Sequence, residues 1–335
     1  MSYVLEVKGM TTQFTTKKGP MTVVDRVSFN VKKGEVLGIV GESGCGKSVT
    51  SLSVMRLLGK NGEVSEGEVL FKGENLAVFS EKEMSKVRGN GISMIFQNPM
   101  TSLNPLLKIG VQIGEVLEKH KKIKGAELKK QVIELLELVE ISRAEAIYDE
   151  YPHQLSGGMK QRVMIALAVA CYPSLLIADE PTTALDVTIQ AQILDLLKSL
   201  RKEFEMAILL ITHDLGVVAE MCDRVAVMYA GQVVETTDTR TLLRNPQHPY
   251  TVGLIESTPQ QSKGEKNLKS IPGKVPTPDQ FAKGCRFSDR CSKVMEKCYI
   301  NPPPFVDIDG TTSSRCWLHV GKEEIIDDYA VTASK

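Results

Sequence analysis

The hydrophobic pattern of the chain alternates between short, continuous apolar runs and longer segments with helical periodicity. The apolar runs lie at residues 36–40, 93–96, 174–178 and 207–212. Continuous runs of this length are typical of strands that are buried on both faces of a parallel sheet. Segments with a helical pattern lie between or beside them, at residues 49–58, 109–147, 163–170 and 187–202. This alternation predicts an α/β fold with a parallel core.

Other segments have strand character without helices between them. These segments are residues 3–7, 11–14, 23–29 and 67–73. They predict an antiparallel β layer beside the parallel core, with a hairpin turn at residues 32–35. The apolar positions of residues 109–147 lie on one helical face and lysines on the other, which predicts a helical subdomain over about residues 98–160. A closing hairpin is expected around Gly231.

Composition and charge exclude several classes of protein. The 335 residues include 41 Lys plus Arg and 41 Asp plus Glu, so no overall basic field attracts nucleic acid, which is not an expected partner. The longest apolar stretch, residues 163–178, is interrupted at residues 171–174, and the first residues lack a signal-peptide pattern. We therefore expect no membrane span and a reducing compartment, in which the seven cysteines are thiols or metal ligands.

Residues 41–48 carry the strongest chemical signal. They match the phosphate-loop pattern G-x-x-x-x-G-K-S/T without a mismatch, between an apolar strand and a helix. Glycines let backbone N–H groups and the helix N-terminus face a phosphate, Lys47 would reach the β- and γ-phosphates, and Ser48 would ligate Mg²⁺. A turn that binds nothing is the alternative, but the full pattern predicts a nucleoside triphosphate site. Its candidate residues are Gly41, Ser43, Gly44, Cys45, Gly46, Lys47 and Ser48.

Polar residues follow three of the apolar strands. They are Gln97, the pair Asp179 and Glu180, and His213. Because the carboxyl ends of parallel strands meet at one edge of a sheet, we expect these residues to face the phosphates there. Two acids beside a phosphate loop suit an aspartate associated with Mg²⁺ and a base that acts on water. From the sequence alone, each residue could instead cap a turn or be structural.

A second helix N-terminus able to bind an anion is predicted at Ser156, Gly157 and Gly158, which precede an apolar helix. The plain alternative is that Ser156 caps the helix and the glycines form a turn. The sequence leaves both interpretations open.

Four of the seven cysteines gather in a proline-rich C-terminal segment with little periodic hydrophobicity. Cys285, Cys291, Cys298 and Cys316 have the spacing C-x5-C-x6-C-x17-C. A small loop-rich unit commonly needs a staple. Four thiolates suit Zn²⁺ or an iron–sulfur cluster, but the spacing matches neither the C-x2-C zinc pattern nor the common ferredoxin runs. Zinc, a cluster and unligated thiols therefore stay open.

Taken in order, these motifs resemble those of an ABC-type ATPase subunit. The matches are residues 41–48 (Walker A), Gln97 (Q-loop), 155–159 (signature), 175–180 (Walker B), 184–186 (D-loop) and His213 (H-loop). Residues 96–105, 245–251 and 271–276 further resemble the oligopeptide/dipeptide importer branch. The resemblance implies a P-loop NTPase fold of ABC type, with a nucleotide-binding domain at residues 1–240. It implies an importer-type, cysteine-rich C-terminal extension at residues 241–335.

The resemblance also implies a role for each matched residue. Glu180 would polarise the attacking water, and His213 would contact the γ-phosphate that Lys47 binds. Ser48, Gln97 and Asp179 would hold or sense Mg²⁺. Phe14 would stack on the purine, although a lone phenylalanine in a strand is more often a core residue.

Across a head-to-tail dimer, the signature residues would serve the phosphate loop of the second subunit. These residues are Ser156, Gly157 and Gly158, and Asp186 would lie there too. The implied cofactors are ATP, Mg²⁺ and a 4Fe–4S cluster on Cys285, Cys291, Cys298 and Cys316, with zinc as the alternative.

The function implied by the resemblance is ATP hydrolysis coupled to the uptake of di- and oligopeptides at the cytoplasmic face of the membrane. The implied partners are a second ATPase subunit, related or identical, two transmembrane permease subunits and, indirectly, an extracellular peptide-binding protein. Alternatives are import of another solute such as nickel, or an ABC ATPase without a transporter. An iron–sulfur redox protein that happens to bind ATP would leave the intact hydrolytic motifs unexplained.

Overall fold

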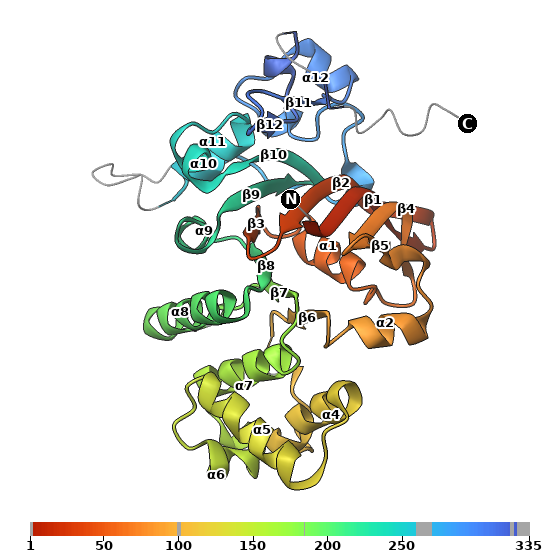
Figure 1. Cartoon of the computed structure of the whole chain (residues 1–335). Helices are drawn as coiled ribbons and strands as arrows, with labels where there is room; N and C mark the ends of the chain where they lie inside the picture. Colours follow the sequence, from red (N-terminus) through yellow and green to blue (C-terminus); the bar gives the residue numbers. More distant parts are fainter. Residues whose placement is uncertain (1–2, 99–101, 184, 259–269, 322–324, 327–335) are drawn as a thin grey trace. The chain divides into compact units, whose positions relative to one another are not determined.

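The four continuous apolar runs are strands in the computed structural model, as the hydrophobic pattern predicts. They are β3 (Val36–Val40), β6 (Ile92–Ile95), β7 (Leu175–Asp179) and β8 (Ala207–Thr212). Every residue of these strands is buried, which explains why nearly all of their side chains are apolar. The polar exceptions are Ser93 in β6 and the last residues of β7 and β8, Asp179 and Thr212. The structure describes residues 3–98, 102–183, 185–258, 270–321 and 325–326 (Figure 1).

The chain divides into two compact units, which we name by their contents. The phosphate-loop unit comprises residues 5–30, 36–77 and 211–335, and the helical unit comprises residues 1–4, 31–35 and 78–210.

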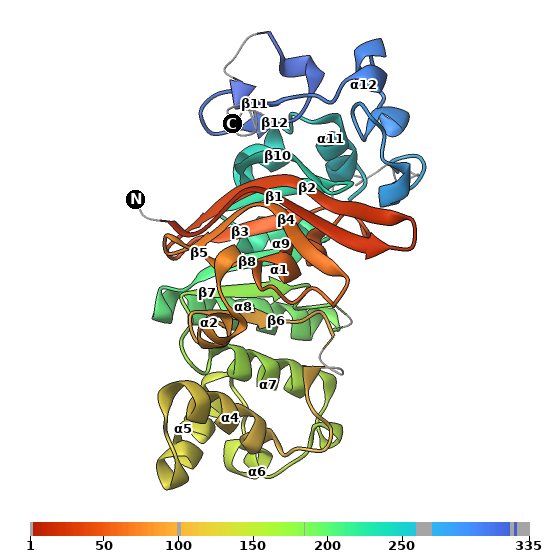
Figure 2. The same cartoon turned by 90° about the vertical axis from the view of Figure 1, so that its right-hand side faces the viewer.

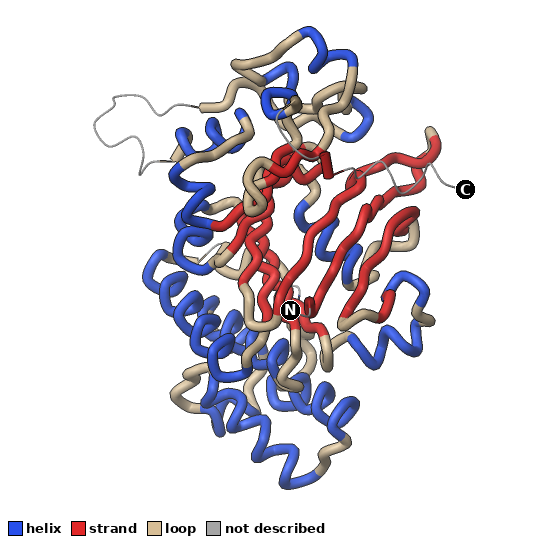
Figure 3. The backbone as a smooth tube through the Cα atoms, turned by 45° about the horizontal axis from the view of Figure 1, so that its top comes forward, coloured by secondary structure: helices blue, strands red, loops and turns tan. Residues whose placement is uncertain are grey.

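In the phosphate-loop unit, the predicted antiparallel layer is a four-stranded sheet in the order β2-β1-β4-β5 (Figures 2 and 3). Its strands are β1 (Tyr3–Thr16), β2 (Gly19–Lys32), β4 (Gly62–Phe71) and β5 (Glu74–Asn75). Strand β4 begins five residues before the predicted start at Gly67. Residues 62–66 are mostly polar and lie outside the buried layer, but they pair with β1, which adds backbone hydrogen bonds that the hydrophobic pattern does not reveal.

The same unit contains strands of a second sheet in the order β13-β11-β12-β10-β9-β3. Strands β9 (Arg224–Tyr229) and β10 (Gln232–Asp238) form the predicted hairpin, and β9 runs parallel to β3. Gly231 is required in the turn, because its φ is +81° and an added Cβ would lie 2.2 Å from the carbonyl oxygen of Val23. The remaining strands are β11 (Phe305–Asp307), β12 (Ser313–Ser314) and β13 (Ile325–Ile326).

One turn prediction is wrong. Residues 32–35 do not close a hairpin, because β2 belongs to the four-stranded sheet and β3 pairs with β9 in the other sheet. The turn therefore passes the chain from one sheet to another.

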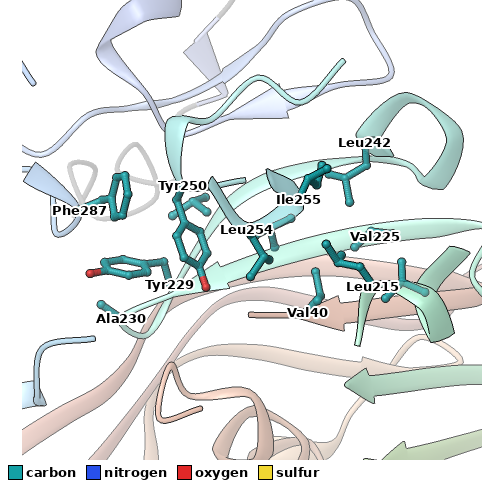
Figure 4. Close-up of a cluster of buried hydrophobic side chains, with 13 residues drawn as sticks. Val40, Leu215, Val225, Tyr229, Ala230, Leu242, Tyr250, Leu254, Ile255 and Phe287 are labelled. Carbon is teal, nitrogen blue, oxygen red and sulfur yellow. The ribbon is translucent and has the colours of Figure 1, made fainter. Parts of the chain in front are cut away.

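Residues after 240 contribute to the core of the phosphate-loop unit. Tyr250 and Phe287 pack against Tyr229 of β9, with ring centroids 4.7 and 5.1 Å from the Tyr229 centroid (Figure 4). Leu215 and Val40 belong to the same buried cluster. The helices of this unit are α1 (Lys47–Val54), α9 (Leu215–Met221), α10 (Thr239–Arg244), α11 (Pro249–Glu256) and α12 (Glu296–Ile300).

In the helical unit, β6 runs parallel to β7, and β7 neighbours β8. Helix α7 (Gly157–Val169) packs on β6 and also contacts α4 (Ile109–Lys121) and α5 (Gly125–Leu138), so it lies between the strand and these helices (Figure 2). The segment at residues 109–147, for which the sequence predicts helix, forms three separate helices. The helices of this unit are α2 (Glu81–Val87), α4 (Ile109–Lys121), α5 (Gly125–Leu138), α6 (Ala144–Tyr148), α7 (Gly157–Val169) and α8 (Val187–Phe204).

Short 3₁₀ turns complete the described elements in both units. They are η1 (Leu76–Val78), η2 (Pro152–Gln154), η3 (Pro278–Gln280), η4 (Ser288–Arg290) and η5 (Trp317–His319).

Candidate functional site

The phosphate loop connects β3 to α1 in the phosphate-loop unit. Gly44 and Gly46 have φ values of +82° and +105°, in the left-handed region that glycine adopts without strain. Gly46 is the residue before α1, so the loop ends directly at the N-terminus of a helix. At the start of the loop, an added Cβ on Gly41 would lie 2.2 Å from the carbonyl oxygen of Met228. The glycines therefore permit both the tight turn and the close approach to β9.

The side chain of Lys47 is buried and turns back over the loop. Its Nζ donates to the carbonyl oxygens of Gly41 and Glu42 at 2.7 and 3.0 Å, and lies 3.9 Å from the Cys45 sulfur. Burial is the main cause that raises the pKa of the Cys45 thiol above its ordinary value, against the opposing effect of the Lys47 charge. Cys45 is therefore a protonated packing residue of the loop.

Two of the polar residues that follow strands lie together in the helical unit. Gln97 follows β6 and Glu180 follows β7, and the Gln97 Nε2 donates to the Glu180 Oε2 at 2.9 Å. The Thr183 hydroxyl donates to the same oxygen at 2.8 Å. Glu180 has a φ of +48°, an uncommon value for a non-glycine residue that recurs at functional sites. Asp179 is buried at the end of β7. Glu180 is thus a carboxylate whose orientation is fixed by two donors and by its backbone.

The signature residues form a helix cap in the helical unit. Ser156 is the N-cap of α7, and its hydroxyl accepts the Met159 N–H at 3.3 Å. Ser156 and Gly157 are exposed, whereas Gly158 packs close to Ile189 of α8. Asp186 caps α8 by accepting the Ile189 N–H at 2.9 Å. The cap predicted from the sequence is present, and the exposed helix N-terminus is able to accept an anion.

The remaining candidate residues lie in the phosphate-loop unit. His213 is exposed and directly follows β8, before the α9 cap residue Asp214. Phe14 of β1 pairs with Gly62 of β4, where its ring covers the glycine. The structure shows this packing contact for Phe14, which suits a core residue and leaves purine stacking a prediction.

The four C-terminal cysteines converge. Burial is the main cause that raises the pKa of Cys285 to about 12 and that of Cys316 to about 11. Cys291, Cys298 and Cys316 add to the shift of Cys285, and Cys291 and Cys298 add to that of Cys316. Cys291 and Cys298 also interact electrostatically. Within the described residues, however, no group of three or more His, Cys, Asp or Glu is arranged to hold a metal ion. Four thiols are thus close to one another without the geometry of a formed metal site.

Comparisons with known proteins agree with this distribution of residues. Residues 24–183 match the family described as ABC transporter, and residues 234–298 match the oligopeptide/dipeptide transporter C-terminal region. The chain is 53% identical to the oligopeptide transport ATP-binding protein AppD of Bacillus subtilis (strain 168), over 95% of this chain and 98% of that protein. It is 52% identical to OppD of the same organism, over 94% of this chain and 88% of that protein.

The chain belongs to the ATP-binding proteins of oligopeptide ABC transporters. Its fold is that of an ABC ATPase cassette: the dimeric ATP-binding cassette MJ0796 bound to ADP and Pi has a TM-score of 0.63 and 30% sequence identity, over 70% of this chain and 99% of that one. Membership of this family makes the chain an ATPase that uses ATP and Mg²⁺. In the part of this ABC ATPase that the structure describes, no helix is both long and apolar enough to cross a membrane.

Three residues that shape the phosphate loop of this ABC ATPase were not predicted from the sequence: Glu42, Tyr250 and Arg290. Tyr250 and Arg290 both bind Glu42, the second residue of the loop. Glu42 occupies a variable position of the loop pattern, so the pattern gives it no role. The one available signal was the placement of Tyr250 inside the importer-type run at residues 245–251.

Proposed function

We propose that this ABC ATPase hydrolyses ATP to drive the uptake of oligopeptides through partner membrane subunits. The observation that carries the proposal is the extent of the similarity: it covers both the cassette and the C-terminal region of proteins named for oligopeptide transport. We assign residues 1–240 to the nucleotide-binding domain, with its helical subdomain at about 98–160, and residues 241–335 to a C-terminal importer-type extension.

In the proposed reaction, the phosphate loop binds the triphosphate through its N–H groups, Lys47 and the N-terminus of α1. Water attacks the γ-phosphorus, the bond to the β–γ bridging oxygen breaks, and ADP leaves. The Glu180 carboxylate polarises this water and accepts its proton, and His213 contacts the γ-phosphate. The donors from Gln97 and Thr183 support this role, because they hold the Glu180 carboxylate in one orientation.

Ser48 and Asp179 would hold Mg²⁺, and Gln97 would hold or sense the same ion. Hydroxyl, carboxylate and amide oxygens are the ligands that this ion prefers, so the residue types fit. When bound there, the ion would supply positive charge that neutralises the negative charge developing on the phosphate during transfer. Phe14 would stack on the purine of the same nucleotide.

The proposed assembly has two ATPase subunits and two permease subunits at the cytoplasmic face of the membrane, supplied by an extracellular peptide-binding protein. Ser156, Gly157, Gly158 and Asp186 would act on the nucleotide of the second ATPase subunit. The exposed N-terminus of α7 supports this role, because it offers N–H groups to a phosphate that approaches from outside.

A 4Fe–4S cluster on Cys285, Cys291, Cys298 and Cys316 is proposed as a further cofactor, with zinc as the alternative. The electrostatic interaction of the four side chains supports this proposal, because four thiolates are a ligand set that both a structural zinc ion and a 4Fe–4S cluster accept. Binding would remove protons from the thiols, and burial raises the pKa of Cys285, Cys291 and Cys316, so iron or zinc would compete with protons there. The cluster would supply a covalent staple between segments of the C-terminal region.

The substitution Glu180→Gln tests the ATPase assignment. We expect the variant to bind ATP with unchanged affinity but to hydrolyse it at least about 10²-fold more slowly, because the amide cannot accept the proton from water. Glu203→Gln, an exposed glutamate of α8, is the matched control and should hydrolyse ATP normally. Uptake of a labelled oligopeptide by cells that carry each variant should fall with hydrolysis. Normal hydrolysis by Glu180→Gln would exclude the assigned base, and normal uptake without hydrolysis would exclude the transport function.

A further inference from the structure

Glu42 of the phosphate loop is held through its amide, its carbonyl and its carboxylate. Its N–H donates to the Tyr250 hydroxyl at 2.9 Å, and its carbonyl accepts from Lys47 Nζ at 3.0 Å. Both carboxylate oxygens accept from Arg290, through Nη1 at 3.1 Å and Nη2 at 3.0 Å. Tyr250 and Arg290 lie 208 and 248 residues further along the chain. The C-terminal region therefore fixes the start of the phosphate loop at two points.

Arg290 is itself held in place. Its side chain is only 6% exposed, its Nε donates to the Pro272 carbonyl at 2.7 Å, and its Nη1 also donates to the Tyr229 hydroxyl at 3.3 Å. The guanidinium lies 5.6 Å from the centroid of the Tyr229 ring, which packs against Tyr250 and Phe287 (Figure 4). A planar guanidinium fixed on several sides presents its fork to a carboxylate with little further loss of entropy.

We propose that Arg290 is a positioning residue for ATP binding, which acts on the phosphate loop through Glu42. Two physical effects support this role. A loop that is already ordered loses little conformational entropy when its ligand binds, so the ligand binds more tightly. In addition, Arg290 neutralises a carboxylate within the loop that must accept a triphosphate, and without this partner the Glu42 charge would repel the phosphates.

This role gives the cysteine-bearing segment a part in the ATPase reaction. Arg290 directly precedes Cys291 and ends the 3₁₀ turn at Ser288–Arg290. In this role, the C-terminal region contributes to nucleotide binding by the cassette, because it sets the affinity of the phosphate loop for nucleotide. The inference rests on ATP binding at residues 41–48.

The test is a double-mutant cycle in the full-length chain with ATP as the probe. Arg290→Met should raise the Kd for ATP about tenfold, equivalent to about 1.4 kcal/mol, because it leaves the Glu42 charge unpaired. Glu42→Gln removes that charge and should change the Kd less than about threefold. The double variant should return to the Kd of Glu42→Gln. In steady-state hydrolysis, Arg290→Met should raise KM much more than it lowers kcat.

Arg286→Met is the matched control. Arg286 belongs to the same segment and pairs with Asp25 and the Ala230 carbonyl, so its loss tests whether any damage to this segment weakens ATP binding. Arg290→Lys serves if Arg290→Met does not fold: it keeps the charge but loses the bidentate fork, and we expect a Kd between those of the wild type and the methionine variant.

Three results would overturn the inference. The first is an Arg290→Met protein that binds ATP within twofold of the wild type. The second is a double variant that stays as weak as Arg290→Met, and the third is an Arg286→Met protein weakened to the same extent. A wild-type protein that does not bind ATP, tested beside Lys47→Ala, would instead contradict the proposed function itself.

Discussion

His248 is a buried histidine whose ring caps a helix. Its Nδ1 accepts the Tyr250 N–H at 3.0 Å at the start of α11, which requires an unprotonated nitrogen. Burial, followed by the charge of His319, lowers the pKa of His248 to about 3, and the nearby Arg315 charge acts in the same direction. Glu235 accepts the backbone N–H of His248, and burial raises the pKa of its carboxyl. These two groups give the C-terminal region opposite dependences on pH.

The low pKa of His248 makes its contribution to the free energy of unfolding depend on pH. Its folded-state pKa of about 3 lies below the ordinary value of 6.5, so between these values the unfolded chain binds a proton that the folded chain does not. The stability that His248 contributes is present above pH 6.5 and is lost as the pH falls toward 3. Glu235 acts in reverse: its raised pKa favours the folded state at low pH, and this contribution is lost as the pH rises.

His248→Asn isolates the histidine, because asparagine can still cap α11 and does not titrate. Between pH 7.5 and pH 5 we expect the wild type to lose about 2 kcal/mol more unfolding free energy than the variant. Urea unfolding at several pH values measures this difference. The contribution of Glu235 to the pH dependence cancels in the comparison, because both proteins carry this residue. His153→Asn changes an exposed histidine and should keep the wild-type dependence of unfolding free energy on pH. Parallel slopes for the wild type and His248→Asn would contradict the prediction.

At the scale of elements, the sequence predicts best where burial alone decides the structure. Strand β3 is apolar throughout, and β7 and β8 are apolar up to their last residues, Asp179 and Thr212, because both faces of these strands are covered. The hydrophobic pattern alone predicts all three strands. The first half of β4 was missed because its polar residues are held by pairing with β1. The turn at residues 32–35 was misassigned because local sequence cannot say which sheet the next strand joins.

The contact between the end of β3 and β9 gives a test at this scale. An added Cβ on Gly41 would lie 2.2 Å from the Met228 carbonyl oxygen and 2.8 Å from the Cys45 sulfur, so Gly41→Ala must displace the loop or the strand. We expect the free energy of unfolding to fall by about 1–3 kcal/mol, together with weaker ATP binding. Gly59→Ala has no atom within 4 Å of the new methyl group, so it should change stability by less than about 0.5 kcal/mol. Equal stability of the two variants would show that the loop yields without cost.

At the scale of the whole molecule, the functional residues divide into those with a local signature and those assembled by folding. The phosphate loop is local, since eight adjacent residues supply the glycines, Lys47 and Ser48. The bond between Gln97 and Glu180 spans 83 residues, yet it was foreseeable because both follow apolar strands. The contacts of Arg290 and Tyr250 with Glu42 could not be predicted from the sequence, because they depend on how the C-terminal region packs on β9.

The four C-terminal cysteines provide the last test. They are spread over residues 285–316, and folding brings them close enough to interact electrostatically, which adds to the effect of burial in raising the pKa values of Cys285, Cys291 and Cys316. We expect anaerobically purified protein to contain about four irons and as many sulfides per chain, with a broad visible absorption band. Cys291→Ser should lose both the iron and the band, because one of four ligands is missing. Cys171→Ser, at a buried cysteine of the helical unit, should retain them. Zinc alone, or no metal in the wild type, would remove the cluster from the proposed function and leave the ATPase assignment intact.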